Sequence, residues 1–407
     1  METSAITGNR NSRSDCEVTL EKTNQPGIDL KISSKVMRLY GKNIRALAET
    51  MIQFYDIKGV SMTINDNGAL DFVLAARIEA AVKQIFDVKT PFLLPLTTSK
   101  SGRTEKSKSR VSRLYLPGNT TSMMINAAIH QPDGIILDLE DSVAPEKKQE
   151  ARILVRNALR SINFFDSERM VRINQLPLGL NDLDEVVPEN PHLILLPKCE
   201  SAEQILQANK RIDELKAINN ISNEIWLMPI IESALGVINA YGIATAATNI
   251  VGMAIGVEDY TADIGTQRTA EGIESLYASS AVINACRAAG LQTSDSVYSD
   301  VMDNEGLKTY IQRSKTLGFD GMGCIHPRQI PLIHDGYAPD AAQLLAAQKI
   351  VDAYQQAIEK GLGVVAVGTK MVDLPVVRRA QRVIATATAR GQWKQNQNMK
   401  KDGSELE

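Results

Sequence analysis

The sequence predicts a small α+β domain followed by a (β/α)₈ TIM barrel with a C-terminal helical extension. Three observations predict this arrangement. The chain has 407 residues, which is long for one ordinary domain. Residues 97–111 are rich in Ser, Thr, Lys and Arg and almost lack large apolar side chains. After this stretch, short apolar runs alternate with helical patterns, as the strands and helices of a barrel do.

The polar stretch divides the chain into domains. Because it cannot bury enough apolar surface to offset the entropy of ordering, it predicts a flexible linker at residues 97–111. We expect the small domain at residues 1–96 and the barrel with its extension at residues 112–396. Residues 397–407 are expected to form a disordered tail.

The small domain shows a mixed pattern of strands and helices. Turn residues separate the expected strands, and apolar residues recur with helical spacing in the expected helices. The predicted strands are residues 16–20, 28–32 and 60–64, and the predicted helices cover residues 35–54 and a segment that begins near residue 71.

Eight apolar runs predict the strands of the barrel. Several are continuously apolar, as expected for parallel strands that are buried on both faces. The alternative is a six-stranded doubly wound sheet. The eight runs are residues 114–116, 134–139, 170–173, 193–196, 225–231, 252–257, 297–301 and 321–325.

Composition excludes several classes of protein. A net charge of −3 is too small to indicate nucleic-acid binding, and no apolar run is long enough to span a membrane. The four cysteines are far apart in the sequence and form no CxxC pair, which argues against a zinc site and a disulfide framework. This cysteine usage is typical of the reducing cytoplasm, where we expect the protein.

Charged and polar side chains recur where the predicted barrel strands end. In a TIM barrel the carboxyl ends of the strands carry the catalytic residues. Glu232 and Asp259 end neighbouring strands, so both carboxylates could reach one Mg²⁺ ion, with water and substrate oxygens completing its shell. Salt bridges around the barrel are the alternative interpretation for these carboxylates.

Two basic residues at these strand ends are candidate substrate ligands. Arg172 could bind a substrate carboxylate with both ends of its planar guanidinium, or it could pair with Glu140 or Asp141. Lys198 could form a Schiff base, as in lysine-dependent aldolases, although pairing with the acidic residues is favoured. His326 could be a general base or a structural hydrogen-bonding residue.

These residues lie in motifs that resemble the citrate lyase β-subunit family within the aldolase/citrate lyase superfamily. The motifs occur in the family's order and span nearly all of residues 112–391. They are Leu116–Gly118, Leu137–Val143, Val171–Asn174, Leu196–Lys198, Ile231–Gly236, Gly256–Tyr260, Ile325–Ile330 and Met371–Pro375.

The resemblance implies a Mg²⁺-dependent lyase that forms a homotrimer or a larger assembly. Glu232 and Asp259 match the family's metal ligands, and Arg172 matches its substrate-binding arginine. Asp373 matches an acidic catalytic residue that is often delivered to a neighbouring subunit. Arg113, and with it Lys108 or Arg110, falls where family members bind the phosphates of a CoA-like arm, whereas Lys108 and Arg110 could equally be solvated linker charges.

The first domain resembles the citrate lyase acyl carrier protein, the γ-subunit. The matching segments include Ile28–Ile32 and Ile64–Asp71. That family carries a phosphoribosyl-dephospho-CoA arm on a serine near its N-terminus. This chain departs from the attachment pattern there, and Ser14, or alternatively Ser12, is the residue that could carry the arm.

Together the two resemblances imply a lyase that cleaves a citryl thioester on the carrier arm into oxaloacetate and an acetyl thioester by a retro-Claisen reaction. Glu140, Asp141 and Lys198 are expected to contribute to substrate binding. A citrate lyase α-type acyltransferase subunit is the implied partner. The alternatives are a lyase for free citramalyl-CoA or malyl-CoA, a non-catalytic carrier or scaffold subunit, and a Schiff-base aldolase.

Overall fold

The computed structural model describes residues 3–96, 103–359, 361, 363–368 and 370–389. The chain divides into two compact units, residues 1–333 and 334–407. The first unit contains the N-terminal domain and the barrel. The predicted tail at residues 397–407 and the first part of the predicted linker, residues 97–102, lie outside the described residues.

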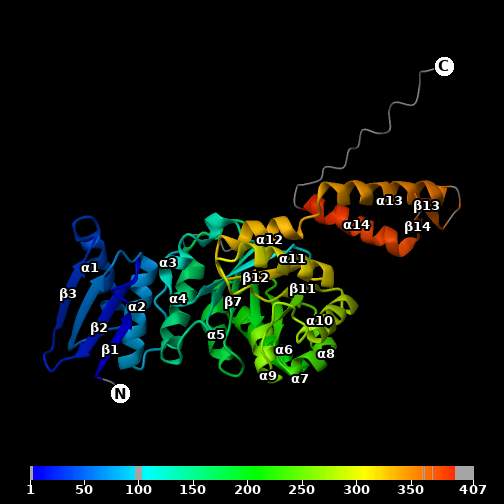
Figure 1. Ribbon diagram of the computed structural model, residues 1–407. Helices are drawn as coiled ribbons and strands as arrows, with labels where there is room; N and C mark the ends of the chain where they lie inside the picture. The colour runs from blue at the N-terminus through cyan, green and yellow to red at the C-terminus, as the bar shows by residue number, and fades with distance from the viewer. Residues whose placement is uncertain (1–2, 97–102, 360, 362, 369, 390–407) are drawn as a thin grey trace. The chain divides into compact units, whose positions relative to one another are not determined.

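The N-terminal domain has a four-stranded sheet with two helices, and Figure 1 shows it in blue. The strand order is β1-β2-β4-β3, antiparallel except for the parallel pair of β3 and β4. Its elements are β1 (Ser4–Gly8), β2 (Cys16–Lys22), β3 (Ile28–Ser34), α1 (Met37–Phe54), β4 (Val60–Asp66) and α2 (Asp71–Ile85).

The predicted elements of this domain are confirmed, and β1 is an addition. Along β2 and β4, buried and partly exposed residues alternate, so one face of the sheet packs on the helices. Val18, Met62 and Ile78 are fully buried in this core. The hydrophobic pattern does not predict β1, because only Ala5 and Thr7 of this strand point inward and neither has a large apolar side chain.

The barrel is closed, and all of its eight strand pairs are parallel. The order around it is β10-β11-β12-β5-β6-β7-β8-β9. A doubly wound sheet is thereby excluded. The strands are β5 (Ser112–Pro117), β6 (Gly134–Asp138), β7 (Glu168–Arg172), β8 (Leu193–Leu196), β9 (Trp226–Ile231), β10 (Gly252–Ile255), β11 (Gln292–Asp295) and β12 (Gly321–Cys324).

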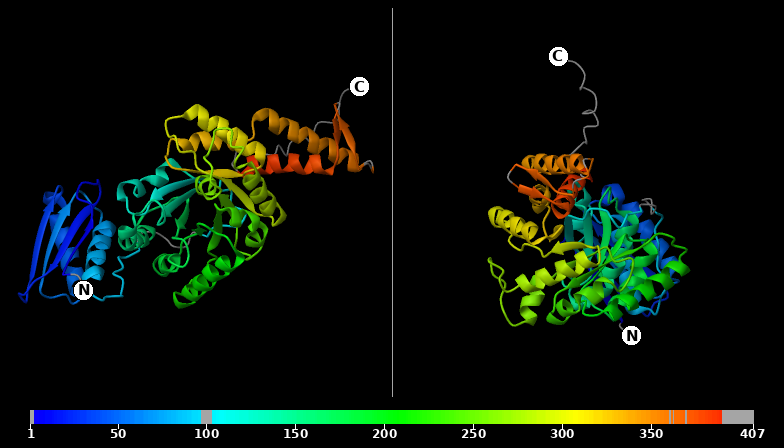
Figure 2. Two further views of the ribbon diagram at one scale, coloured as in Figure 1. Left: turned by 60° about the horizontal axis from the view of Figure 1, so that its bottom comes forward. Right: turned by 90° about the vertical axis from the view of Figure 1, so that its right-hand side faces the viewer.

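Helices follow the strands and cover the barrel, as Figure 2 shows in two further views. The α-helices are α3 (Thr121–Met124), α4 (Lys148–Ser161), α5 (Gly179–Val186), α6 (Ala202–Ile218), α7 (Ala234–Ile238), α8 (Ala240–Ala244), α9 (Val257–Asp263), α10 (Leu276–Ala288), α11 (Asn304–Leu317) and α12 (Gln329–Tyr337). Short 3₁₀ helices lie at Ala127–His130, Pro145–Lys147 and Val187–Glu189.

The predicted position of the seventh barrel strand is wrong. The strand is β11, not residues 297–301, which follow it without strand structure. β11 reads Gln-Thr-Ser-Asp, so its side chains are polar although three of them are buried. Thr293 and Asp295 satisfy their polar atoms through hydrogen bonds, which allows a barrel strand without an apolar sequence.

The second half of the predicted linker packs against the barrel. Arg110 is 3% exposed and pairs with Glu168, the first residue of β7, at 2.7 and 2.8 Å. Lys108 donates through Nζ to the carbonyl of Asp166. Residues 103–111 are therefore no flexible tether, and these two cations are held at the amino-terminal ends of the strands, away from the strand ends that carry the candidate site.

The second unit contains a helical hairpin with a small sheet at its turn. Its elements are α13 (Ala341–Glu359), β13 (Val365–Val367), β14 (Lys370–Val372) and α14 (Leu374–Ala389), with β13 and β14 antiparallel. The predicted helical extension is confirmed. Within the described part of the chain, no helix combines the length and the apolar character needed to cross a membrane.

Candidate active site

A cavity of about 510 Å³ opens at the carboxyl-terminal end of the barrel strands. This is the end at which TIM barrels carry their active sites. The polar and charged residues that line it come from the ends of six strands. They are Tyr115, Asp138, Asp141, Ser142, Arg172, Glu232, Glu258, Asp259, Asp295 and Ser296.

Arg172 ends β7 and is fixed against Asp138, which ends β6. Its Nε and Nη2 donate to the two carboxylate oxygens of Asp138 at 2.7 and 2.8 Å. The guanidinium also lies over the Tyr115 ring, 5.2 Å from its centroid. Burial alone would raise the pKa of Asp138, but hydrogen bonds and charge from Arg172 outweigh it and lower that pKa. Arg172 is therefore a charged group that Asp138 holds in position in the cavity wall.

Glu140, Asp141 and Lys198 form an ionic cluster next to this pair. Arg172 Nη1 lies 2.8 Å from Glu140 and 3.8 Å from Asp141. Lys198 Nζ pairs with Glu140 and lies 3.3 Å from Asp141. Asp141 lines the cavity, whereas Glu140 and Lys198 are not among its lining residues. The pairing that the sequence allowed for Arg172 and Lys198 is thus present, and Glu140 and Lys198 support the wall instead of forming its surface.

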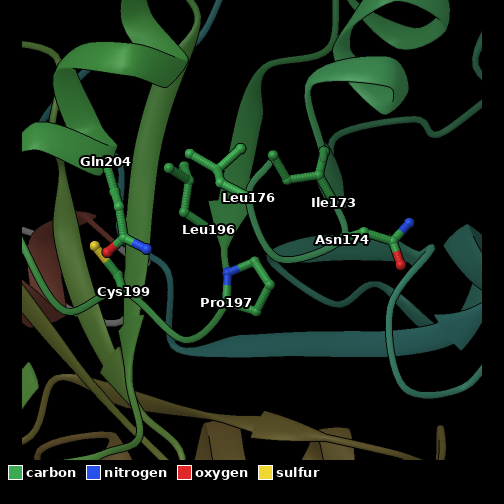
Figure 3. Close-up of a pocket in the computed structure, with 7 residues that line it drawn as sticks. All are labelled: Ile173, Asn174, Leu176, Leu196, Pro197, Cys199 and Gln204. Carbon is green, nitrogen blue, oxygen red and sulfur yellow. The ribbon is translucent and has the colours of Figure 1, made fainter. Parts of the chain in front are cut away.

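The backbone of Lys198 is held in an uncommon conformation. Its φ of +50° lies in the left-handed region, which non-glycine residues rarely adopt. Figure 3 shows a small pocket at the adjoining segment, which Pro197 and Cys199 line together with Asn174 and Gln204. This small pocket has no volume accessible to water. The Lys198 N–H donates to Glu232 Oε1 at 2.6 Å.

Glu232 is a buried carboxyl group with a raised pKa. It follows β9 and is 4% exposed. Burial, and next the negative charge of Asp259, raise its pKa from 4.5 to about 8. Gly256 makes room for it, because a Cβ at this position would lie 2.3 Å from Glu232 Oε2. Asp259 lies in the first turn of α9, directly after the neighbouring strand β10.

These two carboxylates fit a divalent cation. The negative charge of Asp259 helps to raise the pKa of Glu232, and a cation bound between two such carboxylates stabilises the ionised form. Mg²⁺ is usually held by one or two carboxylates with water and substrate oxygens. In the described residues, no cluster of three or more His, Cys, Asp or Glu side chains has the arrangement of a metal site.

Asp295 is a cavity residue that the sequence analysis missed. It ends β11, is 6% exposed, and accepts hydrogen bonds from the Ser296 N–H and the Tyr310 hydroxyl at 2.7 and 2.9 Å. Burial raises its pKa. The misplaced seventh strand hid it, because a strand at residues 297–301 puts Asp295 before the strand instead of at its end.

The predicted contact of Arg113 with a CoA arm is not supported. Arg113 lies near the start of β5, is 1% exposed, and points Nη1 at the Met228 sulfur, 2.8 Å away. A side chain buried inside the barrel at the amino-terminal end of the strands cannot contact a ligand that enters from the other end. This burial could not be predicted from the sequence, because Arg113 is charged and directly precedes an apolar run.

Two other predicted residues, Asp373 and His326, have local hydrogen bonds of their own. Asp373 belongs to the second unit, where it directly precedes α14 and accepts a hydrogen bond from the Val376 N–H at 3.4 Å. His326 follows β12, and its Nδ1 accepts from the Arg328 N–H at 3.1 Å. That hydrogen bond is the structural role allowed for His326, and His326 is not a lining residue of the cavity.

Ser12 and Ser14 lie in the turn between β1 and β2. The Ser14 N–H donates to the Asn67 carbonyl, and the Asn67 side chain donates to the Ser12 carbonyl. Both serines are partly exposed. Ser14 has a φ of +59°, so the turn has a fixed, uncommon backbone shape at this residue.

Two family models match separate parts of the chain. Residues 111–327 match the family model described as HpcH/HpaI aldolase/citrate lyase. Residues 2–85 match a family model of acyl carrier proteins described as malonate decarboxylase delta subunit. The second match ends at the last residue of α2, where the N-terminal domain completes its core.

The chain is also similar to individual proteins along most of their length. The chain is 40% identical over 283 residues to the citrate lyase subunit beta of Haemophilus influenzae, covering 69% of this chain and 97% of that protein. It is 30% identical to the human mitochondrial citramalyl-CoA lyase, covering 73% and 91%. A solved structure of CitE from Mycobacterium tuberculosis in complex with magnesium, acetoacetate and coenzyme A matches with a TM-score of 0.56 at 29% identity, covering 70% of this chain and 100% of that one.

Proposed function

The chain belongs to the HpcH/HpaI aldolase/citrate lyase family, and from this premise we propose that it is a Mg²⁺-dependent lyase that cleaves a citryl thioester into oxaloacetate and an acetyl thioester. One observation carries the proposal: Glu232, Asp259 and the Arg172–Asp138 pair face a single cavity at the catalytic end of the barrel. Relatives named citrate lyase subunit beta match this chain over almost their full length.

In this proposal Glu232 and Asp259 hold the magnesium ion. The solved relative with the TM-score of 0.56 contains magnesium, and the two carboxylates fit such an ion. When bound there, Mg²⁺ supplies a Lewis acid that polarises substrate oxygens. Glu232 is oriented for this by the Lys198 N–H and by the absence of a side chain at Gly256.

The residues around the cavity account for binding and charge stabilisation. Arg172 has guanidinium hydrogens left after its contacts with Asp138 and Glu140, so it can bind a substrate carboxylate. In the reaction a base takes the substrate hydroxyl proton, and the C–C bond breaks to leave a keto acid. The bonding electron pair becomes the enolate of the acetyl thioester, which then takes a proton. Fixed positive charge beside the enolate oxygen lowers the barrier to cleavage of the C–C bond.

The base and the arm come from outside the cavity in this proposal. Asp373 of a neighbouring subunit is the candidate acid or base in a homotrimer or larger assembly. The N-terminal domain is a citrate lyase-type acyl carrier with a phosphoribosyl-dephospho-CoA arm on Ser14, or alternatively on Ser12. An α-type acyltransferase subunit loads this carrier. The carrier-family match and the partly exposed serines support this part.

A lyase for a free CoA thioester is the second candidate, favoured by the match to the human citramalyl-CoA lyase. Purified protein is assayed with citryl-CoA, citramalyl-CoA and malyl-CoA, and the oxaloacetate, pyruvate or glyoxylate released is measured with coupled dehydrogenases. We expect oxaloacetate from citryl-CoA and loss of activity with a chelator. Preferential release of pyruvate or glyoxylate would contradict the citryl assignment, and no product from any thioester would favour a non-catalytic subunit.

The arm is tested separately by intact mass. Protein purified from its own host is weighed, and the peptide covering residues 1–22 is sequenced by mass spectrometry. We expect an added phosphoribosyl-dephospho-CoA on Ser14 or Ser12. An unmodified peptide from a host that makes the arm would contradict the carrier role and favour free thioesters as substrates.

A further inference from the structure

Helix α2 of the N-terminal domain is buried on all sides. Twelve of its 15 residues are buried, and ten consecutive residues of α4 in the barrel, Glu150 to Leu159, are buried as well. A helix on the surface of a domain normally buries one stripe only. Figures 1 and 2 show α2 between the sheet of its own domain and the barrel. We propose that the N-terminal domain is docked in one fixed position on its own barrel, and that this docking holds the Ser12–Ser14 turn beside the barrel's catalytic end.

The first set of contacts is a buried ionic network at the middle of the two helices. Arg156 of α4 donates to both carboxylate oxygens of Glu79 in α2 at 2.9 and 2.7 Å. It also pairs with Glu185 at 2.8 Å. Lys83 of α2 bridges the same two carboxylates at 2.8 and 3.4 Å. Because Glu79 is 0% exposed, its negative charge is stabilised by Lys83 from its own domain and by Arg156 from the barrel domain.

The network defines one arrangement of the two helices. Apolar contacts alone tolerate sliding, whereas a buried charge is stable only where its partners meet it with good geometry. The Asn157 side chain adds a hydrogen bond to the Phe72 carbonyl at 3.1 Å, at the start of α2. Several charge-assisted bonds from different points of α2 therefore fix both its position and its rotation.

The second set of contacts joins the Ser12–Ser14 turn to the barrel. Asp15, which follows Ser14, accepts two bonds from Arg77 of α2 at 3.0 and 2.9 Å. The same guanidinium pairs with Glu150 of α4 at 3.4 Å and donates to the Asn119 carbonyl at 3.3 Å. Asp15, Arg77 and Glu150 are all at most 4% exposed.

Asn119 lies at the catalytic end of the barrel. It belongs to the segment after β5, in which the Gly118 N–H donates to the Asp138 carbonyl at 2.7 Å. Asp138 lines the cavity and holds Arg172. A short series of contacts therefore leads from Ser14 through Arg77 to the cavity wall. An arm on this serine starts its path beside its own active site, a consequence that rests on the proposed function, whereas the docking itself does not.

Docking is tested by cutting the chain. A protease site replaces residues 97–102, the folded protein is cleaved, and the products are separated by size-exclusion chromatography. We expect the N-terminal fragment to elute with the barrel and the amides of residues 72–82 to keep their protection from hydrogen exchange. Separate elution with loss of that protection would overturn the proposal.

Matched variants of α4 test the ionic network. Arg156→Ala removes the barrel's guanidinium from Glu79 and Glu185 and leaves Lys83 of α2 beside them, and we expect it to release the fragment after cleavage. Arg152→Ala is the control. Arg152 is a buried arginine of the same helix, but its partner Asp182 belongs to α5 of the barrel domain and not to the N-terminal domain. Circular dichroism of the uncut variants shows that each is folded. Retention of the fragment by Arg156→Ala would overturn the role of this network.

Delivery to the chain's own barrel is tested by complementation. Chains with Ser12→Ala and Ser14→Ala are co-expressed with chains that carry Glu232→Gln, and carrier-dependent citrate cleavage is measured. We expect background activity, because each arm serves its own barrel. Restored activity would overturn delivery within one chain. The serine double variant should still cleave free citryl-CoA, and failure there would count against the proposed function instead.

Discussion

Glu232 and Gly256 lie so close that a single methyl group on Gly256 would be 2.3 Å from the Glu232 carboxylate. Gly256 has a φ of −105°, which any residue can adopt, so space and not backbone conformation requires glycine here. The neighbouring strands β9 and β10 place these residues side by side. Gly256 therefore decides where the Glu232 oxygens lie in the cavity.

Gly256→Ala should weaken magnesium binding without unfolding the protein. Because the methyl group would displace the Glu232 carboxylate, we expect a loss in Mg²⁺ affinity of about 10- to 100-fold, the range for residues that orient a metal ligand. Isothermal titration with Mg²⁺ measures it. Gly242→Ala is the control, since an added Cβ there meets no atom within 4 Å. Equal affinities for the two variants would contradict this role of Gly256.

Magnesium binding should compete with a proton on Glu232. The pKa of Glu232 without metal is about 8, and Mg²⁺ needs the ionised carboxylate. Below pH 8 we expect affinity to rise about tenfold per pH unit, with nearly one proton released per ion, and above pH 9 we expect neither effect. Titrations in two buffers of different ionisation enthalpy measure the proton count.

The same pKa predicts how the stability of the metal-free protein depends on pH. The folded-state pKa is raised above its ordinary value of 4.5, so the stability from protonated Glu232 is fully present below about pH 4.5 and is lost as pH rises through about 8. Glu232→Gln should remove this dependence. If Mg²⁺ binding to the wild-type protein releases no proton at pH 6.5, Glu232 is already ionised at that pH, which would contradict both predictions.

Arg172→Lys should lower kcat with little change in fold. Lysine keeps the charge but loses the planar pair of bonds to Asp138, so the positive group moves out of position. Removing one fixed donor from a site that stabilises developing charge costs about 10²- to 10³-fold in kcat, and we expect a loss in this range. Steady-state kinetics measure it, with Arg211→Lys as the control because Arg211 pairs with Asp184 on the surface. A change in KM alone would show that Arg172 only binds substrate.

Lys198 should not form a Schiff base. Burial would lower its pKa, but the hydrogen bond and charge of Glu140, together with Asp141, outweigh it and raise the pKa, which keeps the amine protonated and unreactive. We expect borohydride with substrate to leave activity unchanged and EDTA to abolish it. Peptide mapping after borohydride provides the control, and a labelled Lys198 together with resistance to EDTA would support the aldolase alternative.

The sequence predicted the barrel because most of its strands are continuously apolar. It also predicted that Glu232 and Asp259 lie together, because these carboxylates follow two neighbouring strands. It failed where polar side chains are buried. β11 is polar throughout, so Asp295 was missed, and Arg113 looked accessible although it lies inside the barrel. Burial of charge depends on partners that are distant in the sequence, such as Glu168 for Arg110, and one sequence does not show those pairs.

Arg110→Ala should destabilise the barrel although Arg110 lies within the predicted linker. The substitution leaves Glu168, which is 0% exposed, without its guanidinium partner. Breaking a buried pair in this way costs about 3–5 kcal/mol in the free energy of unfolding. Urea denaturation followed by circular dichroism measures it. Lys108→Ala is the matched control, because its Nζ reaches only a carbonyl at the surface, and we expect a change of at most about 0.5 kcal/mol. If both variants unfold at the wild-type urea concentration, residues 103–111 contribute nothing to the barrel and act only as a tether.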